Sequence, residues 1–133
     1  MKKDILIPKV KDVGIAVVPK QEAEVKFWQA YVVNFSTDTL QTVLISSKGF
    51  GELEGREKET ATMRHFIEEI GPKDFHPFEG MIDDLAALTN EFWLSYYANN
   101  KLYDKKFVFV AESISEENFV SIPILKAKGV LIV

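Results

Sequence analysis

The sequence contains no cysteine, and its only arginines are Arg56 and Arg64. Without cysteine, disulfide bonds, thiolate catalysis and sulfur-ligated zinc are excluded. Arginine is the usual residue for bidentate contacts with phosphate, so its scarcity argues against nucleic acid as a partner. The net charge of −4 points the same way, because an acidic chain disfavours a polyanion.

Long apolar runs are also missing. No segment reaches the roughly 20 apolar residues that a membrane helix requires. Charged residues interrupt the stretch MKKDILIPKVKDV at residues 1–13, which therefore lacks the pattern of a signal peptide. We expect a cytoplasmic protein with no membrane partner. Its 133 residues, 47% hydrophobic and 27% charged, are typical of a single soluble domain spanning residues 1–133.

The stretch from Lys26 to Phe50 is the most informative part of the chain. Two runs of β-branched and aromatic residues flank the polar segment STDT, which predicts a β-hairpin. In the first run, apolar residues occupy both parities of the strand. A strand that is apolar on both faces is normally central and covered on both sides.

Other strands are predicted at residues 13–18, 61–70, 91–98, 101–112 and 119–125, and in the terminal VLIV. Asn99-Asn100 suits a tight hairpin turn. Residues 49–60 are predicted as a polar loop and residues 80–88 as a short helix. The fold predicted is mainly β, an antiparallel immunoglobulin-like two-sheet sandwich of seven or eight strands with one short helix. A mixed α+β fold is the alternative, if residues 61–70 and 78–88 are both helical.

Motifs for catalysis and cofactor binding are few. The glycines of SSKGFGELEG lack a following apolar helix and indicate a turn rather than a phosphate-binding loop. No GxSxG elbow occurs, and no cofactor is predicted. His65 and His76 are the only histidines, and with nearby carboxylates they could form a metal site. Isolated histidines are more often structural or exposed, so this remains the alternative hypothesis.

Aromatic residues dominate the predicted strands. Trp28 and Trp93 are predicted as large core residues. The apolar surface of the strands can exceed what one core covers, and surplus of that kind marks a protein contact. The candidate binding residues are Trp28, Val32, Tyr97 and Tyr103. The terminal VLIV either closes a sheet internally or adds to another chain.

Several stretches resemble a family of small bacterial cytosolic proteins of unknown function: WQAYVVNFSTDTLQTVLISSKGFGELEG, MRHFIEEI, NEFWLSYYANNKLYDKKFVF and ESISEENFVSIPILKAKGVLIV. The resemblance covers nearly the whole chain but includes no functional motif. Some relatives carry a phenylalanyl-tRNA synthetase label, which would imply tRNA-related binding. The order of strands is also similar to a β-sandwich domain of unknown function found beside Smr domains, which implies a sandwich and an interaction module.

Three hypotheses about function follow. The leading one is a protein-interaction module without enzymatic activity, which binds a protein partner or self-associates as a homo-oligomer. The alternative is a small metal-binding protein or hydrolase that uses His65 and His76. A weaker alternative is tRNA-related binding.

Overall fold

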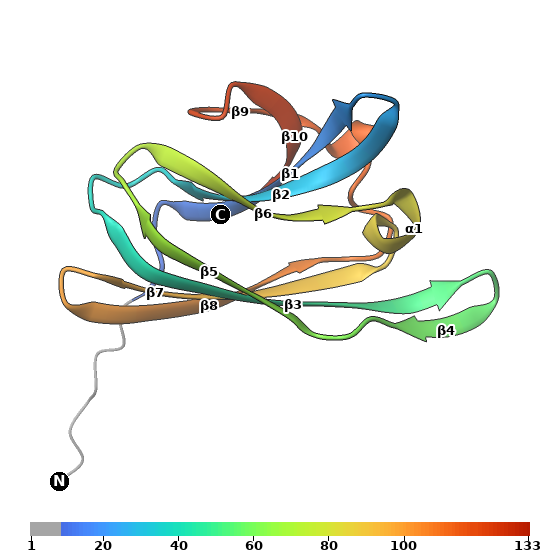
Figure 1. Cartoon of the computed structure of the whole chain (residues 1–133), viewed down its shortest axis with the longest axis horizontal. Coiled ribbons are helices and arrows are strands. Elements are labelled where there is room, and N and C mark those ends of the chain that lie inside the picture. The colour runs from blue at the N-terminus through green and yellow to red at the C-terminus, as the bar shows by residue number, and fades with distance from the viewer. Residues whose placement is uncertain (1–8) are drawn as a thin grey trace, which may run out of the picture.

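A computed structural model describes residues 9–133 and shows two stacked antiparallel β-sheets (Figure 1). Residues 1–8 lie outside the described residues. They include most of the stretch in which the sequence predicts no signal peptide. The strands and helices in chain order are β1 (Val13–Glu22), β2 (Val25–Asn34), β3 (Leu40–Leu53), β4 (Arg56–Glu59), β5 (Met63–Ile70), β6 (Asp74–Met81), α1 (Asp83–Ala86), β7 (Thr89–Ala98), β8 (Lys101–Phe109), the 3-10 turn η1 (Glu116–Asn118), β9 (Val120–Ile122) and β10 (Ala127–Ile132).

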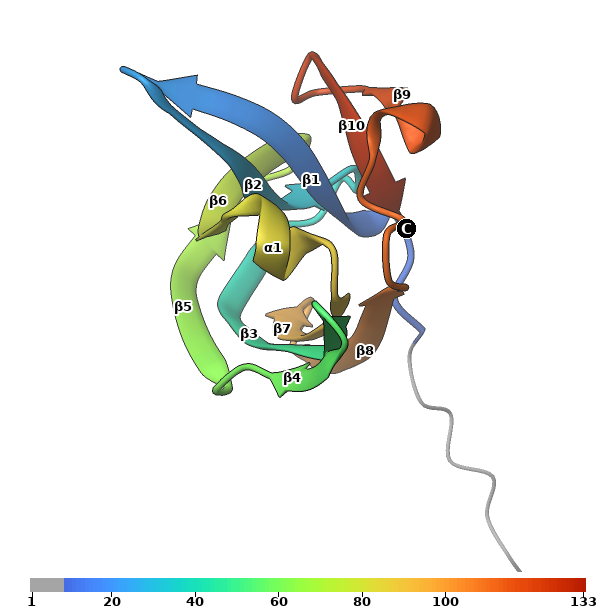
Figure 2. The same ribbon diagram turned by 90° about the vertical axis from the view of Figure 1, so that its right-hand side faces the viewer.

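Sheet 1 has the strand order β6-β2-β1-β10-β9, and sheet 2 has the order β4-β3-β7-β8. β5 also pairs with β3, alongside the residues of β3 that precede its pairing with β4. The connection from β5 to β6 passes from sheet 2 to sheet 1 and lies along one side of the sandwich (Figure 2). The chain is therefore mainly β with two antiparallel sheets, as the sequence predicts, but the described residues form ten strands rather than seven or eight.

The main core lies between the two sheets. It contains alternate residues of the central strands, among them Val32, Ile45, Phe92, Leu94 and Phe107, which are at most 1% exposed. Aromatic rings meet edge to face within it, for example those of Phe92 and Phe109, whose centroids are 5.7 Å apart. Alternation of side chains along each strand sends one parity of residues into this core.

A second cluster covers the outer face of sheet 1. Ala16, Val18, Tyr31 and Val33 point away from the main core and are buried against residues of the C-terminal segment, including Ile122. β2 is therefore central and covered on both faces, as its apolar pattern predicts. The outer face of sheet 1 owes its cover to residues that follow β8 in the chain.

The hairpin predicted for residues 26–50 is wrong, because β2 and β3 lie in different sheets. β2 pairs with β1 and β6, whereas β3 pairs with β4, β5 and β7. The segment STDT crosses between the layers, and the buried Asn34 stabilises this corner. Its Nδ2 donates to the backbone oxygens of Asp38 at 2.7 Å and Gly71 at 2.9 Å, while its Oδ1 accepts from Ser36. Such bonds to backbone are typical of a turn-forming asparagine.

Two further predictions are corrected. Residues 49–60 do not form a loop but the end of β3, a tight turn at Glu54-Gly55 and β4. Both turn residues have positive φ, which a two-residue hairpin turn requires. The helix predicted at residues 80–88 is limited to α1, and the preceding residues form β6, an edge strand that tolerates Pro77 beside a bulge.

Other local predictions are confirmed. Residues 63–70 form β5, and Asn99-Asn100, both with positive φ, join β7 to β8. The terminal VLIV contributes to β10, which pairs with β1 and closes sheet 1 internally. A Cβ on Gly129 would lie only 2.5 Å from the carbonyl oxygen of Val17, so this close approach of backbones requires glycine.

Candidate functional site

The four predicted binding residues do not share a surface. Val32 is fully buried between the sheets and is inaccessible to a partner. Trp28 is partly buried and packs against the same core from sheet 1. Tyr103 also packs on the core, with its ring stacked on Tyr96 at a centroid distance of 5.3 Å. Only Tyr97, in β7, is exposed to a large extent, at 45%.

The stacked tyrosines belong to the interior of the sandwich. Burial, and to a smaller extent the neighbouring Tyr103 and Asp38, raises the pKa of the Tyr96 phenol above its ordinary value. The phenol therefore stays neutral through the physiological range. Its role is packing, with no acid–base chemistry near neutral pH.

The two histidines have separate partners. His65 in β5 lies 2.7 Å from Glu79 through its Nε2, while His76 in β6 is exposed and its Nδ1 lies 2.7 Å from the carbonyl oxygen of Pro77. Among residues 9–133, no three histidine and carboxylate side chains are arranged so that they could hold a metal ion. The structure therefore does not assemble the metal centre hypothesised around this pair.

Glu79 connects the two sheets through a polar cluster with Ser47 and His65. Its Oε1 accepts hydrogen bonds from Ser47 Oγ at 2.5 Å and from His65 Nε2 at 2.7 Å. In a nucleophilic triad the imidazole stands between serine and carboxylate, so that it can take the hydroxyl proton. Here the carboxylate stands between the other two groups. The cluster joins β3, β5 and β6, and its geometry is structural rather than nucleophilic.

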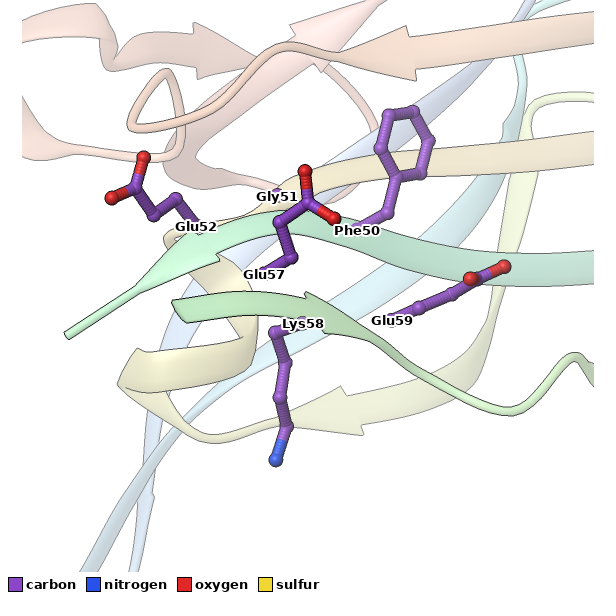
Figure 3. Close-up of a pocket in the computed structure, with 6 residues that line it drawn as sticks. All are labelled: Phe50, Gly51, Glu52, Glu57, Lys58 and Glu59. Atoms are coloured by element: carbon purple, nitrogen blue, oxygen red, sulfur yellow. The ribbon is translucent and has the colours of Figure 1, made fainter. Parts of the chain in front are cut away.

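A hollow of about 550 Å³ lies at the end of the β3–β4 hairpin (Figure 3). Glu52 and Glu57 are directly opposite each other across the hairpin, and Glu59 is opposite Phe50. Figure 3 shows Glu52, Glu57 and Phe50 on one side of the ribbon. Glu59 forms an ion pair with Lys48. The hollow is open and acidic, and it forms one end of the outer face of sheet 2. Its lining residues are Phe50, Gly51, Glu52, Glu57, Lys58 and Glu59.

The outer face of sheet 2 carries half of the large exposed apolar side chains among residues 9–133. Six large apolar side chains that point outward from β3, β5, β7 and β8 are between 38% and 62% exposed. We call them the aromatic face: Leu44, Phe50, Phe66, Trp93, Tyr97 and Leu102.

The pairing of strands shows that these side chains are neighbours. Phe66 is directly opposite Leu44 in the β5–β3 pair, and Leu44 is opposite Ser95 in the β3–β7 pair. Tyr97 is directly opposite Leu102 in the β7–β8 pair. Residues at directly opposed positions share a face of the sheet with Cβ atoms about 5 Å apart. The aromatic face thus contains two directly opposed apolar pairs, Phe66–Leu44 and Tyr97–Leu102. Trp93 lies four residues before Tyr97 on β7, and Phe50 lies further along β3.

Charged side chains on the aromatic face balance one another. Lys106 lies with its Nζ 5.7 Å from the centroid of the Trp93 ring and 3.4 Å from Glu91. Where β3 pairs with β4, β5 and β7 and where β7 pairs with β8, the outward-pointing charges are Lys48, Arg64 and Lys106 on the one hand and Glu59, Glu69, Glu91 and Asp104 on the other. Apart from the acidic tip of the hairpin, the face is therefore close to neutral on a chain of net charge −4.

Sequence reasoning placed Trp93 in the core, and the structure corrects this: the side chain is 50% exposed. The alternation of side chains along β7 indicates that Trp93 is exposed. Phe92, Leu94 and Tyr96 form a consistently apolar parity, whereas Trp93 shares its parity with Ser95. A parity that mixes aromatic and polar residues is typical of an exposed face.

Comparison of the chain with protein-family models, with curated protein sequences and with solved structures found no match. Across residues 9–133, no helix has both the length and the apolar character needed to span a membrane.

Proposed function

We propose that this protein is an interaction module without enzymatic activity, which docks a protein partner on the aromatic face. The observation that carries the proposal is the concentration of six exposed large apolar side chains on one uncovered sheet face. Large apolar side chains gathered on one exposed face of a monomeric protein often mark a binding site. The composition also fits, because aromatic residues are enriched at the centres of protein interfaces.

The contrast between the two sheets supports this reading. The outer face of sheet 1 is covered by the chain's own C-terminal segment, which buries Tyr31 and Val33. The outer face of sheet 2 has no such cover from the described residues, although it carries side chains as large as Trp93 and Phe66. A protein partner would cover the outer face of sheet 2, as the C-terminal segment covers the outer face of sheet 1.

The composition supports the proposed location, and the polar cluster around Glu79 supports the proposed binding role. The absence of cysteine fits the cytoplasm, where the module would act. The immunoglobulin-like relationship of the sandwich stays a prediction, and the proposal does not depend on it. The polar cluster around Glu79 favours a binding role over hydrolysis, because its imidazole does not stand between the serine and the carboxylate.

Site-directed photo-cross-linking tests the proposal. Because the chain has no cysteine, the substitution Tyr97→Cys provides one attachment point for a benzophenone maleimide on the aromatic face. The matched control is Val25→Cys, at a side chain that is 62% exposed near the turn between β1 and β2. After irradiation in extract from the source organism, we expect discrete protein adducts from position 97, identified by mass spectrometry. Adducts no more abundant than those from position 25 would overturn the proposal.

A further inference from the structure

We infer that the partner of the aromatic face is a second copy of this chain, docked face to face across a two-fold axis with the two β3–β4 hairpins pointing in opposite directions. This inference rests on the proposed function and names the partner. It follows from the area of the face, its balance of charge, the protection of the sheet edges and the acidic hairpin tip.

The area of the face is sufficient for a dimer. Strands lie about 4.8 Å apart and rise about 3.4 Å per residue, so four strands of about ten residues cover roughly 650 Å² of flat area. Side-chain relief increases the accessible area further. Standard protein interfaces bury about 800 Å² on each partner. Face-to-face packing of two such sheets would therefore bury an area close to that of a stable interface.

The balance of charge favours an identical partner. Where strands of sheet 2 pair, the outward side chains include three basic and four acidic groups outside the hairpin tip, and Lys106 already pairs with Glu91 within the face. A strongly basic or acidic partner would gain little from such a surface. In a symmetric dimer the same patch is used twice, so it must be compatible with itself. A nearly neutral face that carries both signs meets this requirement.

The edges of the sheets are poorly suited to association. β4 has the sequence REKE, and β8 carries Lys101, Lys105 and Lys106. β6 contains Pro77 and a bulge, and β9 has only three residues. Charges, proline, bulges and short length are the means by which edge strands avoid pairing with another chain. Association by extension of a sheet is thus disfavoured at these four edges, whereas the aromatic face is open.

The acidic hairpin selects the orientation of the two copies. If the two-fold axis ran along the strands, the hairpin tips would lie over each other and would bring Glu52 and Glu57 of both copies together. Like charges placed opposite each other destabilise a contact. If the axis runs across the strands, each tip projects beyond the partner and remains in water. We therefore place the axis across the strands, near Leu44 and Ser95, which are directly opposed at the centre of the aromatic face.

Sedimentation velocity of the full chain from about 1 to 500 μM tests the dimer. We expect a concentration-dependent shift from monomer to dimer in the wild type. Leu44→Glu should weaken dimerisation at least about 100-fold, roughly tenfold for each of its two symmetry-related copies. Val25→Glu introduces the same charge at an exposed apolar residue outside the face and should leave dimerisation unchanged. Circular dichroism and the melting temperature show whether each variant is folded.

A spin label attached to Arg56→Cys, at the start of β4, tests the orientation. Leu44 and Leu53 are nine residues apart on β3, so each tip lies about 30 Å from the proposed axis. We expect a label-to-label distance of roughly 60 Å by pulsed electron paramagnetic resonance. Tips that lay together on sheets about 10 Å apart would give roughly 20 Å or less, which would overturn the orientation.

Two results would overturn the inference of a second copy. One is a folded wild-type chain that stays monomeric at all concentrations. The other is a dimer that Leu44→Glu does not weaken. Photo-cross-linking from position 97 shows whether these results refute only the second copy or the proposed function as well. A monomer whose position 97 captures a different protein would refute the second copy and leave the interaction module intact, whereas a monomer without adducts would refute both.

Discussion

Substitution of Asn34 by alanine should destabilise the corner that separates β2 from β3. The Asn34 side chain is fully buried and has four hydrogen bonds of 3.0 Å or less, two donated to the carbonyl oxygens of Asp38 and Gly71 and two accepted from Ser36. A typical hydrogen bond contributes about 1 kcal/mol net, and a buried partner left unsatisfied costs more. Water can replace some partners at this partly exposed turn. We therefore expect Asn34→Ala to lower the free energy of unfolding by about 2–4 kcal/mol.

Asn34→Asp provides a sharper test of the same geometry. The substitution keeps the oxygen that accepts from Ser36 but replaces the donating nitrogen with a second oxygen, which then faces the carbonyl oxygens of Asp38 and Gly71. Repulsion between these oxygens adds to the cost of burying a charge. At pH 7 we expect Asn34→Asp to be less stable than Asn34→Ala, although aspartate is closer to asparagine in size.

Urea unfolding followed by circular dichroism at 25 °C measures these differences. Asn118→Ala is a suitable control, because that side chain makes one exposed bond of 2.8 Å to the carbonyl oxygen of Ser113. Its loss should cost less than about 1 kcal/mol. A free energy of unfolding of Asn34→Ala within about 1 kcal/mol of the wild type, or an Asn34→Asp variant more stable than Asn34→Ala, would contradict this role of the Asn34 side chain.

Three further predictions concern the core, the pH dependence and the pairing of β1 with β10. Phe92→Ala should cost about 3–5 kcal/mol and Trp93→Ala less than half of that, because only the first is buried; equal losses in urea unfolding would contradict this placement. The raised pKa of Tyr96 means that the folded state favours the neutral phenol, so its contribution to stability is complete below about pH 10 and is lost as the pH rises above that value. Tyr96→Phe should therefore lose less stability than the wild type between pH 8 and pH 11 in urea unfolding, and an identical loss in the two proteins would contradict the burial of this phenol. Gly129→Ala would place a methyl group 2.5 Å from a carbonyl oxygen of β1 and should cost about 1–3 kcal/mol; an unchanged melting temperature would count against that close contact.

The class of fold was predictable because it depends on local patterns. The strand at β7 and the Asn99-Asn100 turn are both visible in the sequence, and the structure confirms both. The preference for a strand at residues 61–70 also proved correct, although a helical pattern was present. In each case the side chains of neighbouring residues and the φ requirements of a turn are sufficient to select the element.

The arrangement of strands was not predictable in the same way, because it depends on contacts between distant residues. The segment between β2 and β3 has the length and composition of a hairpin turn, yet Asn34 bonds to the carbonyl oxygen of Gly71, far along the chain. β6 was missed because Pro77 and Gly80 argue against a strand, whereas an edge position with a bulge tolerates them. Hydrogen-bond and strand partners so distant in the sequence cannot be identified from a local pattern of residues.

The residues of the candidate binding surface were likewise predictable only in part. Tyr97, a candidate binding residue, is exposed, but the structure puts Val32 in the core and brings Trp93 to the surface. In the sequence alone, a strand with two apolar faces such as β2 offers surplus apolar surface. Only the path of the C-terminal segment shows that both faces of β2 are covered.

The composition of outward positions, rather than the amount of apolar surface, distinguishes the two sheets. On sheet 1 the outward residues are mostly aliphatic, such as Val18 and Val33, and they are covered by the chain itself. On sheet 2 the outward parity combines Trp93 with Ser95, and Lys106 lies over the indole ring. A docking face must remain soluble before its partner arrives, which requires polar groups among rings that tolerate water. This requirement does not apply to a face that is covered as soon as the chain folds. The mixed composition of the outer face of sheet 2 is therefore the one expected of the docking face that we propose.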